Sequence, residues 1–64
     1  MKIDFVNIRI GSEYKVLPTD HTKRWLRRFV GKTGVCKMSS SMRGASLVFN
    51  THTEVVPFDA LQPA

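Results

Sequence analysis

Hydrophobic and polar residues alternate with a period of two in the first part of the chain. Within residues 2–10 the alternation changes phase between Phe5 and Val6, which predicts a bent or bulged strand. A second alternating stretch, residues 13–17, ends at Pro18 and predicts a short strand. The two stretches are compatible either with a hairpin or with one bent strand.

Over residues 20–30 the spacing of the apolar residues changes from two to about 3.6. In a helical projection the apolar side chains fall in one arc of about 140°: Trp25, Leu26, Phe29 and Val30. The cationic side chains fall in the opposite arc: Lys23, Arg24, Arg27 and Arg28. Thr19 or Asp20 is suited to cap the start of the helix, and Gly31 is suited to the left-handed position after its end. The pattern predicts an amphipathic helix of about three turns, which docks on the rest of the fold through Trp25 and Phe29. The alternative for Trp25 is stacking on a base, but its place inside the apolar arc favours packing against the core or a partner.

Short alternating stretches return after the helical segment. The strands that they predict are residues 31–38, 45–50 and 53–58. Polar turns join them at residues 39–44 and 50–53, an arrangement typical of an antiparallel meander. The tail, residues 59–64, is expected to form a closing turn around Leu61.

The segments RRFVGKTGVCKM, SLVF and VVPFDALQP resemble the KOW-type SH3-like small barrels of some ribosomal proteins and transcription elongation factors. The resemblance covers roughly residues 27–63. Its matching positions lie in a G-K-T-G-like turn, in the strands and in a V-P-x-x-x-L-like ending: Gly31, Gly34, Val35, Val48, Phe49, Pro57 and Leu61. It implies a small barrel of a kind that serves RNA contacts, protein docking and a few enzymes. The chain departs from the family by placing a helical segment before the GKTG turn, where ordinary members have an irregular loop.

We therefore expect residues 1–64 to form a single domain of mainly β structure. The expected fold is an SH3-like small antiparallel barrel of about five strands with one short inserted helix at about residues 20–30. So short a chain buries only roughly 60% of the surface that its unfolded form exposes. The thin core argues against a large internal active-site cavity, so functional residues are expected on the surface.

The net charge of +5 is unevenly distributed along the chain. Every residue with a formal charge between His21 and Thr53 is positive, so this middle part carries +7 and the remainder −2. Clustered cations attract phosphate backbones, anionic lipid head groups or acidic protein surfaces. The candidate nucleic-acid-binding residues are Lys23, Arg24, Arg27, Arg28, Lys32, Lys37 and Arg43.

No pattern of a catalytic or metal site stands out. The GKT letters lack the glycine that a Walker A loop has five residues before its GK pair, because residue 26 is Leu. His21, His52 and the serine-rich turn have no spacing that indicates a nucleophile with its base, and one cysteine with two histidines does not match a zinc site. We therefore expect a non-enzymatic protein without catalytic residues, metal or cofactor.

Cys36 is the only cysteine and is expected to be a small buried hydrophobic residue. The longest apolar run is three residues, Leu47–Phe49, whereas about 20 are needed to span a bilayer. Asp4 and Arg9 interrupt the first ten residues, unlike a signal peptide. These features predict a cytoplasmic protein without a membrane partner.

The leading functional hypothesis is a binding module that associates with RNA or DNA through a basic, phosphate-directed face. The alternative is a small regulatory or virus-encoded protein that docks on an acidic surface of a larger protein machine. A third hypothesis is a homo-oligomer with a site at its symmetry axis.

Overall fold

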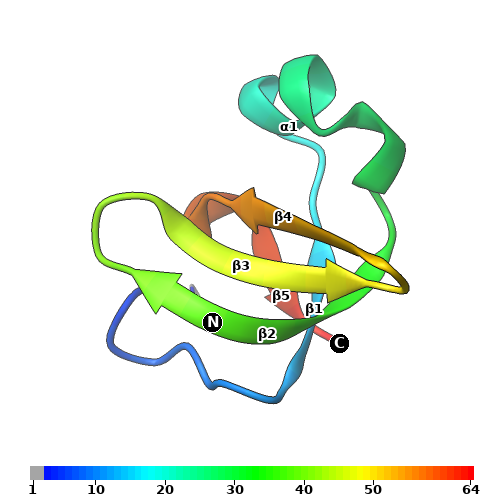
Figure 1. Cartoon of the computed structure of the whole chain (residues 1–64). Coiled ribbons are helices and arrows are strands. Elements are labelled where there is room, and N and C mark those ends of the chain that lie inside the picture. The colour runs from blue at the N-terminus through cyan, green and yellow to red at the C-terminus, as the bar shows by residue number, and fades with distance from the viewer. Residues whose placement is uncertain (1–2) are drawn as a thin grey trace.

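The computed structural model describes residues 3–64, in which five strands form one antiparallel sheet (Figure 1). In chain order the elements are β1 (Glu13–Val16), α1 (Asp20–Trp25), the 3₁₀ turn η1 (Arg27–Phe29), β2 (Thr33–Ser40), β3 (Gly44–Phe49), β4 (His52–Val56), the 3₁₀ turn η2 (Phe58–Ala60) and β5 (Leu61–Pro63). The strand order is β4-β3-β2-β1-β5, so β4 and β5 are the edges. The sheet surrounds one core and stays open between these edges. The expected mainly β antiparallel fold is therefore confirmed, and its arrangement is compatible with an SH3-like small barrel.

The core lies on the concave side of the sheet. Along β3, Ala45, Leu47 and Phe49 point inward and are buried, as period-two alternation requires. The register of the sheet sets Cys36 of β2 opposite Leu47, and Val56 of β4 opposite Ala45. The meander predicted for β2, β3 and β4 is therefore confirmed, with strand ends that differ by a few residues.

Cys36 is a buried core residue, as expected, with only 1% of its surface exposed. Its Sγ lies 3.6 Å from the Met38 carbonyl oxygen, to which it donates a hydrogen bond. Burial raises the pKa of the Cys36 thiol, because the thiolate loses its hydration. The thiol is thus held in its unreactive form.

The strand predicted for residues 2–10 is wrong for its described part; Lys2 lies outside the described residues. The Asp4 carboxylate accepts hydrogen bonds from the backbone N–H groups of Val6 and Asn7, at 3.0 Å each. These local bonds form a turn and take backbone groups that a strand would need. The fifth strand is instead β5, in the tail where the sequence indicated only a closing turn, and it pairs with β1.

The helix predicted for residues 20–30 ends early. α1 stops at Trp25, because Leu26 leaves the helical conformation with φ of −125° and ψ of 33°. The 3₁₀ turn η1 follows, and Leu26 and Phe29 are both buried in the core. The ring centroids of Phe29 and Phe49 lie 4.7 Å apart. Docking through Phe29 is confirmed. Docking through Trp25 is wrong, since the change of direction leaves 69% of that side chain exposed.

Gly31 ends this segment with φ of +83°, as its predicted left-handed position requires. A Cβ added there would meet no atom within 4 Å, so a substitution costs backbone strain alone. We expect Gly31→Val to lower the free energy of unfolding by about 1 kcal/mol or more. Urea denaturation followed by circular dichroism measures this difference, and an unchanged midpoint would show that the turn tolerates a side chain.

Candidate nucleic-acid interface

The start of α1 is fixed by Thr22, which is fully buried. Its backbone N–H donates to Thr19 Oγ1 at 3.1 Å, and its Oγ1 accepts from the Thr19 backbone N–H at 2.8 Å. This reciprocal pair is a capping box, so Thr19 is the cap. The Thr22 hydroxyl also donates to the Leu17 carbonyl oxygen at 2.7 Å. These bonds set the direction in which α1 leaves β1.

Residues 17–30 form an excursion between β1 and β2 that is closed at its base by two hydrogen bonds. The Val16 N–H donates to the Lys32 carbonyl oxygen at 3.0 Å, and the Gly31 N–H donates to the Val16 carbonyl oxygen at 2.8 Å. As a result α1 and η1 project together from one side of the sheet, away from the N-terminal segment (Figure 1). We call this projection, residues 20–29, the helical arm.

Three arginines and the exposed tryptophan surround a shallow hollow on the helical arm. The residues that line it are Arg24, Trp25, Arg27 and Arg28. No carboxylate lines the hollow, and within residues 3–64 none of the three arginines forms an ion pair. Their guanidinium groups are therefore free to bind anions. We call this feature the Trp25 hollow.

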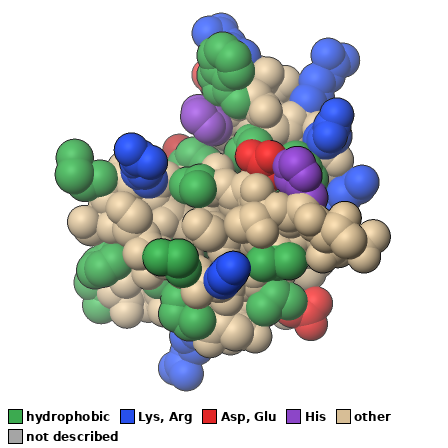
Figure 2. Space-filling model, in the orientation of Figure 1, with side chains coloured by type: hydrophobic (Ala, Val, Ile, Leu, Met, Phe, Trp, Pro, Cys, Tyr) green, Lys and Arg blue, Asp and Glu red, His purple; other side chains and the backbone are tan. Residues whose placement is uncertain are grey.

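Lysine and arginine side chains gather around the helical end of the molecule and are sparser over the sheet (Figure 2). Lys23 is exposed on the helical arm itself. Lys32 is exposed at the base of the arm, where it borders a second hollow beside Phe29 and Phe49. Five of the seven predicted cations thus belong to the arm or its base.

The remaining two cations, Lys37 and Arg43, lie along the β2–β3 hairpin. Lys37 is the extra residue of a β-bulge, since Cys36 pairs with Leu47 and Met38 pairs with Ser46. Arg43 is exposed in the turn that precedes β3. Neither residue lines the Trp25 hollow, and the turn that carries Arg43 lies away from the arm (Figure 1).

Sequence reasoning favoured packing of Trp25 over stacking on a base, whereas the structure leaves this residue 69% exposed. A helix continued to Val30 would have turned its indole toward the core together with Phe29. The available signal was its place at the very edge of the apolar arc, only about 60° from Arg28 in projection. A helix that ends after six residues moves such an edge residue out of the core.

Glu54, the acidic residue of β4, is already engaged on its own strand. It lies opposite Leu47 in the register and pairs with His52 Nε2. The His52 ring in turn stacks on Phe29, with centroids 5.4 Å apart. The Glu54 carboxylate is thereby held at the sheet edge by a neighbour that itself contacts the core.

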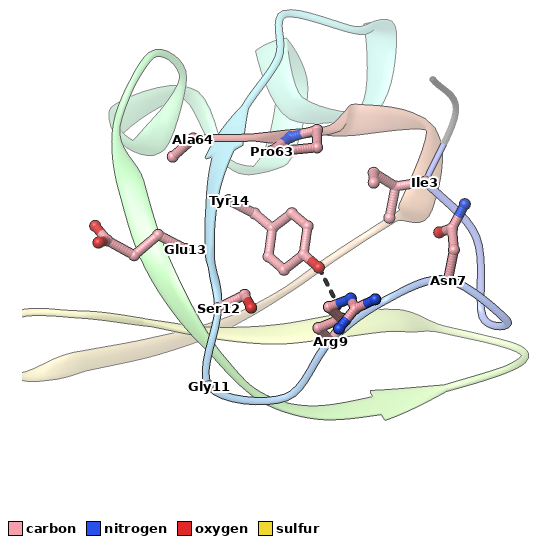
Figure 3. Close-up of a pocket in the computed structure, with 9 residues that line it drawn as sticks. All are labelled: Ile3, Asn7, Arg9, Gly11, Ser12, Glu13, Tyr14, Pro63 and Ala64. Atoms are coloured by element: carbon pink, nitrogen blue, oxygen red, sulfur yellow. Dashed lines mark hydrogen bonds between the residues drawn. The ribbon is translucent and has the colours of Figure 1, made fainter.

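A further pocket, of about 450 Å³, lies where the N-terminal segment meets β1 and the C-terminal residues (Figure 3). The Tyr14 hydroxyl accepts a hydrogen bond from the Arg9 backbone N–H at 2.8 Å at one side of it. Both Arg9 and Glu13 line this pocket. Because it carries both signs of charge, it does not extend the basic surface of the arm.

Within residues 3–64, no cluster of three or more histidine, cysteine, aspartate or glutamate side chains is placed to hold a metal ion. No helix in the same residues is long and apolar enough to cross a bilayer. Comparisons with models of protein families, with curated proteins and with solved structures each find no match. The case for a function therefore depends on the geometry of the surface.

Proposed function

We propose that this protein is a non-enzymatic binding module that associates with RNA or DNA through the helical arm. The observation that carries the proposal is the Trp25 hollow, with its three arginines and no carboxylate. Guanidinium groups bind phosphate oxygens with two parallel hydrogen bonds, which makes arginine well suited to a nucleic-acid backbone. Phosphate contacts of this kind supply most of the affinity of sequence-independent binding.

The distribution of charge over the surface also favours binding of a nucleic acid at the helical arm. The acids in the described residues lie in the N-terminal loop, in β1, at the first residue of α1, in β4 and in η2: Asp4, Glu13, Asp20, Glu54 and Asp59. The cations concentrate at the arm and its base, so a polyanion meets its most favourable potential there. Lys23 and Lys32 flank the arginines and extend the contact along the arm, while Lys37 and Arg43 offer a separate, weaker contact.

The assignment to KOW-type barrels is part of this proposal. Its support is the GKTG turn, in which Gly31 takes a positive φ and Gly34 packs closely against β3. A Cβ at Gly34 would lie 2.9 Å from Phe49 Cε1 and 3.0 Å from Leu47 Cβ. Both glycines are thus required by geometry at the positions where the resemblance places them. A cytoplasmic location and a homo-oligomeric state stay predictions.

The test is a salt titration of the purified protein against duplex DNA, duplex RNA and single strands of both. We expect binding to at least one of them with a dissociation constant tighter than about 100 μM near physiological salt, and an affinity that falls steeply as salt is added. Affinity should depend little on base sequence, because phosphate contacts position a protein without reading bases. Binding weaker than about 100 μM to all of them would overturn the proposal.

A second candidate function is docking on an acidic protein surface, and the outer face of the sheet favours it. Val35, Met38 and Val55 are 42%, 62% and 44% exposed on this face, and the cross-strand register sets Met38 and Val55 on either side of Ser46. Apolar side chains lie across the front of the sheet in Figure 2. Lys37 stands in the bulge between Val35 and Met38 and complements an acidic partner.

A poly-glutamate chain is a suitable probe for this second candidate, because it offers carboxylates without bases or phosphates. Binding to poly-glutamate that exceeds binding to every nucleic acid, and that Lys37→Gln weakens, would favour docking on protein. Binding to nucleic acid that Lys37→Gln leaves unchanged would favour the helical arm. The mass of the purified protein in solution, measured by light scattering, tests whether it is a homo-oligomer.

A further inference from the structure

We propose that Trp25 is a stacking platform for an unpaired base, so that the preferred ligand of the helical arm is single-stranded nucleic acid. The inference rests on the proposed function, since the arginines hold the phosphates on either side of the stacked base. It adds a ligand class and a binding residue that phosphate contacts alone do not supply.

Trp25 is largely exposed and is not part of the buried core. Its side chain is 69% exposed, although a tryptophan offers one of the largest apolar surfaces of any residue. No ring contact within the described residues involves it. The core beneath the arm is completed by Leu26 and Phe29, which are 5% and 7% exposed. The indole is therefore available to a ligand.

The surroundings of Trp25 indicate which ligand fits. The other side chains that line the hollow are all arginines. A nucleotide presents a flat π-face next to a phosphate, so one residue of the ligand can contact the indole and a guanidinium at once. In a duplex the base faces are covered by neighbouring bases, whereas in a single strand they are free to stack on an aromatic side chain.

An anionic membrane surface fits the arm less well. Interfacial helices insert an apolar face into the membrane. In the helical arm, however, Leu26 and Phe29 are already buried in the core, and among the apolar residues only Trp25 is exposed. α1 itself has only six residues. The arm thus offers a single aromatic side chain among cations, which matches the combination of stacking and charge found in sequence-tolerant single-strand binders.

The experiment uses Trp25 as its own reporter, because it is the only tryptophan in the chain. Indole fluorescence of the protein is titrated with oligothymidylate, with oligouridylate, with an abasic strand of the same length and charge, and with a duplex. We expect both base-containing single strands to quench the indole and to bind about 5- to 150-fold more tightly than the abasic strand. Comparison of oligothymidylate with oligouridylate shows whether DNA or RNA is preferred. If neither of them quenches the indole, the base does not stack on Trp25.

Two variants supply the controls, and because both lack the only indole of the chain, their affinities are measured by the fluorescence anisotropy of labelled strands, with the original protein measured in the same way. Trp25→Ala should remove the advantage of base-containing over abasic strands, and Trp25→Phe should restore part of it, because phenylalanine keeps an aromatic face. Neither variant should move the thermal midpoint of unfolding by more than about 4 °C, since the side chain is largely exposed.

The outcomes separate this inference from the proposed function. If all strands bind but the abasic strand binds as tightly as the others, without a difference in quenching, the stacking platform is overturned and phosphate binding stands. Binding to the duplex that is tighter than to every single strand would also overturn it. If no nucleic acid binds, the proposed function fails and the platform fails with it.

Discussion

Gly44→Ala is expected to remove most of the stability of this protein. Gly44 begins β3 with φ of +119°, a conformation that residues with a side chain rarely adopt. A Cβ added there would collide with the Val56 carbonyl oxygen and would lie 2.8 Å from Pro57 Cα. Both obstacles are backbone atoms of the neighbouring strand and its exit, so they can yield only if β3 and β4 separate.

We expect Gly44→Ala to lower the free energy of unfolding by at least about 3 kcal/mol, from strain at positive φ together with the steric clash. Small domains have only about 5 kcal/mol to lose at the lower end of the usual range. The accessibility of the Cys36 thiol reports the loss of the folded state, because Cys36 is the only cysteine and is 1% exposed in the folded protein. In the variant a thiol reagent should modify Cys36 rapidly without denaturant.

Gly11→Ala is the matched control. Gly11 also has a positive φ, of +92°, but a Cβ added there would meet no atom within 4 Å. Its cost should be limited to backbone strain of about 1–2 kcal/mol. If the two variants were equally stable, the close approach of Gly44 to β4 would not matter for folding.

Replacing Arg24, Arg27 and Arg28 together with glutamine is expected to have the largest effect on binding. All three side chains are exposed and unpaired within the described residues, so folding should change little. For each arginine–phosphate pair that is removed, the slope of log affinity against log salt should fall by about 0.9 on duplex DNA or about 0.7 on single strands. Removal of all three pairs would reduce the slope by about 2.7 or 2.1, respectively, for all sequences alike.

The control removes the same amount of charge from elsewhere on the surface. Lys15 on β1, Lys37 on β2 and Arg43 in the β2–β3 turn are exposed and lie outside the Trp25 hollow. Their joint replacement with glutamine should leave most of the salt dependence in place. Equal reductions of affinity in the two triple variants would mean that net charge alone attracts the ligand and that the helical arm is not its site.

Local patterns were sufficient to predict much of the fold. The alternation along β2, β3 and β4 places residues such as Cys36 and Leu47 on one face, and only one register buries that face. The start of α1 at Thr19 and the positive φ of Gly31 depend on groups close in sequence. The N-terminal strand was mispredicted, because hydrogen bonds of the Asp4 side chain to nearby backbone compete with strand pairing.

The sequence alone determined the type of fold, the buried position of Cys36 and the concentration of positive charge between His21 and Thr53. Only the tertiary structure decided which cations lie together and where Trp25 lies. The reason is that Leu26 and Phe29 must reach the core while Gly31 returns to pair with Val16. The chain leaves the helical conformation at Leu26 and the indole lies among the arginines, and the long-range contacts that accompany this break are not apparent from local spacing.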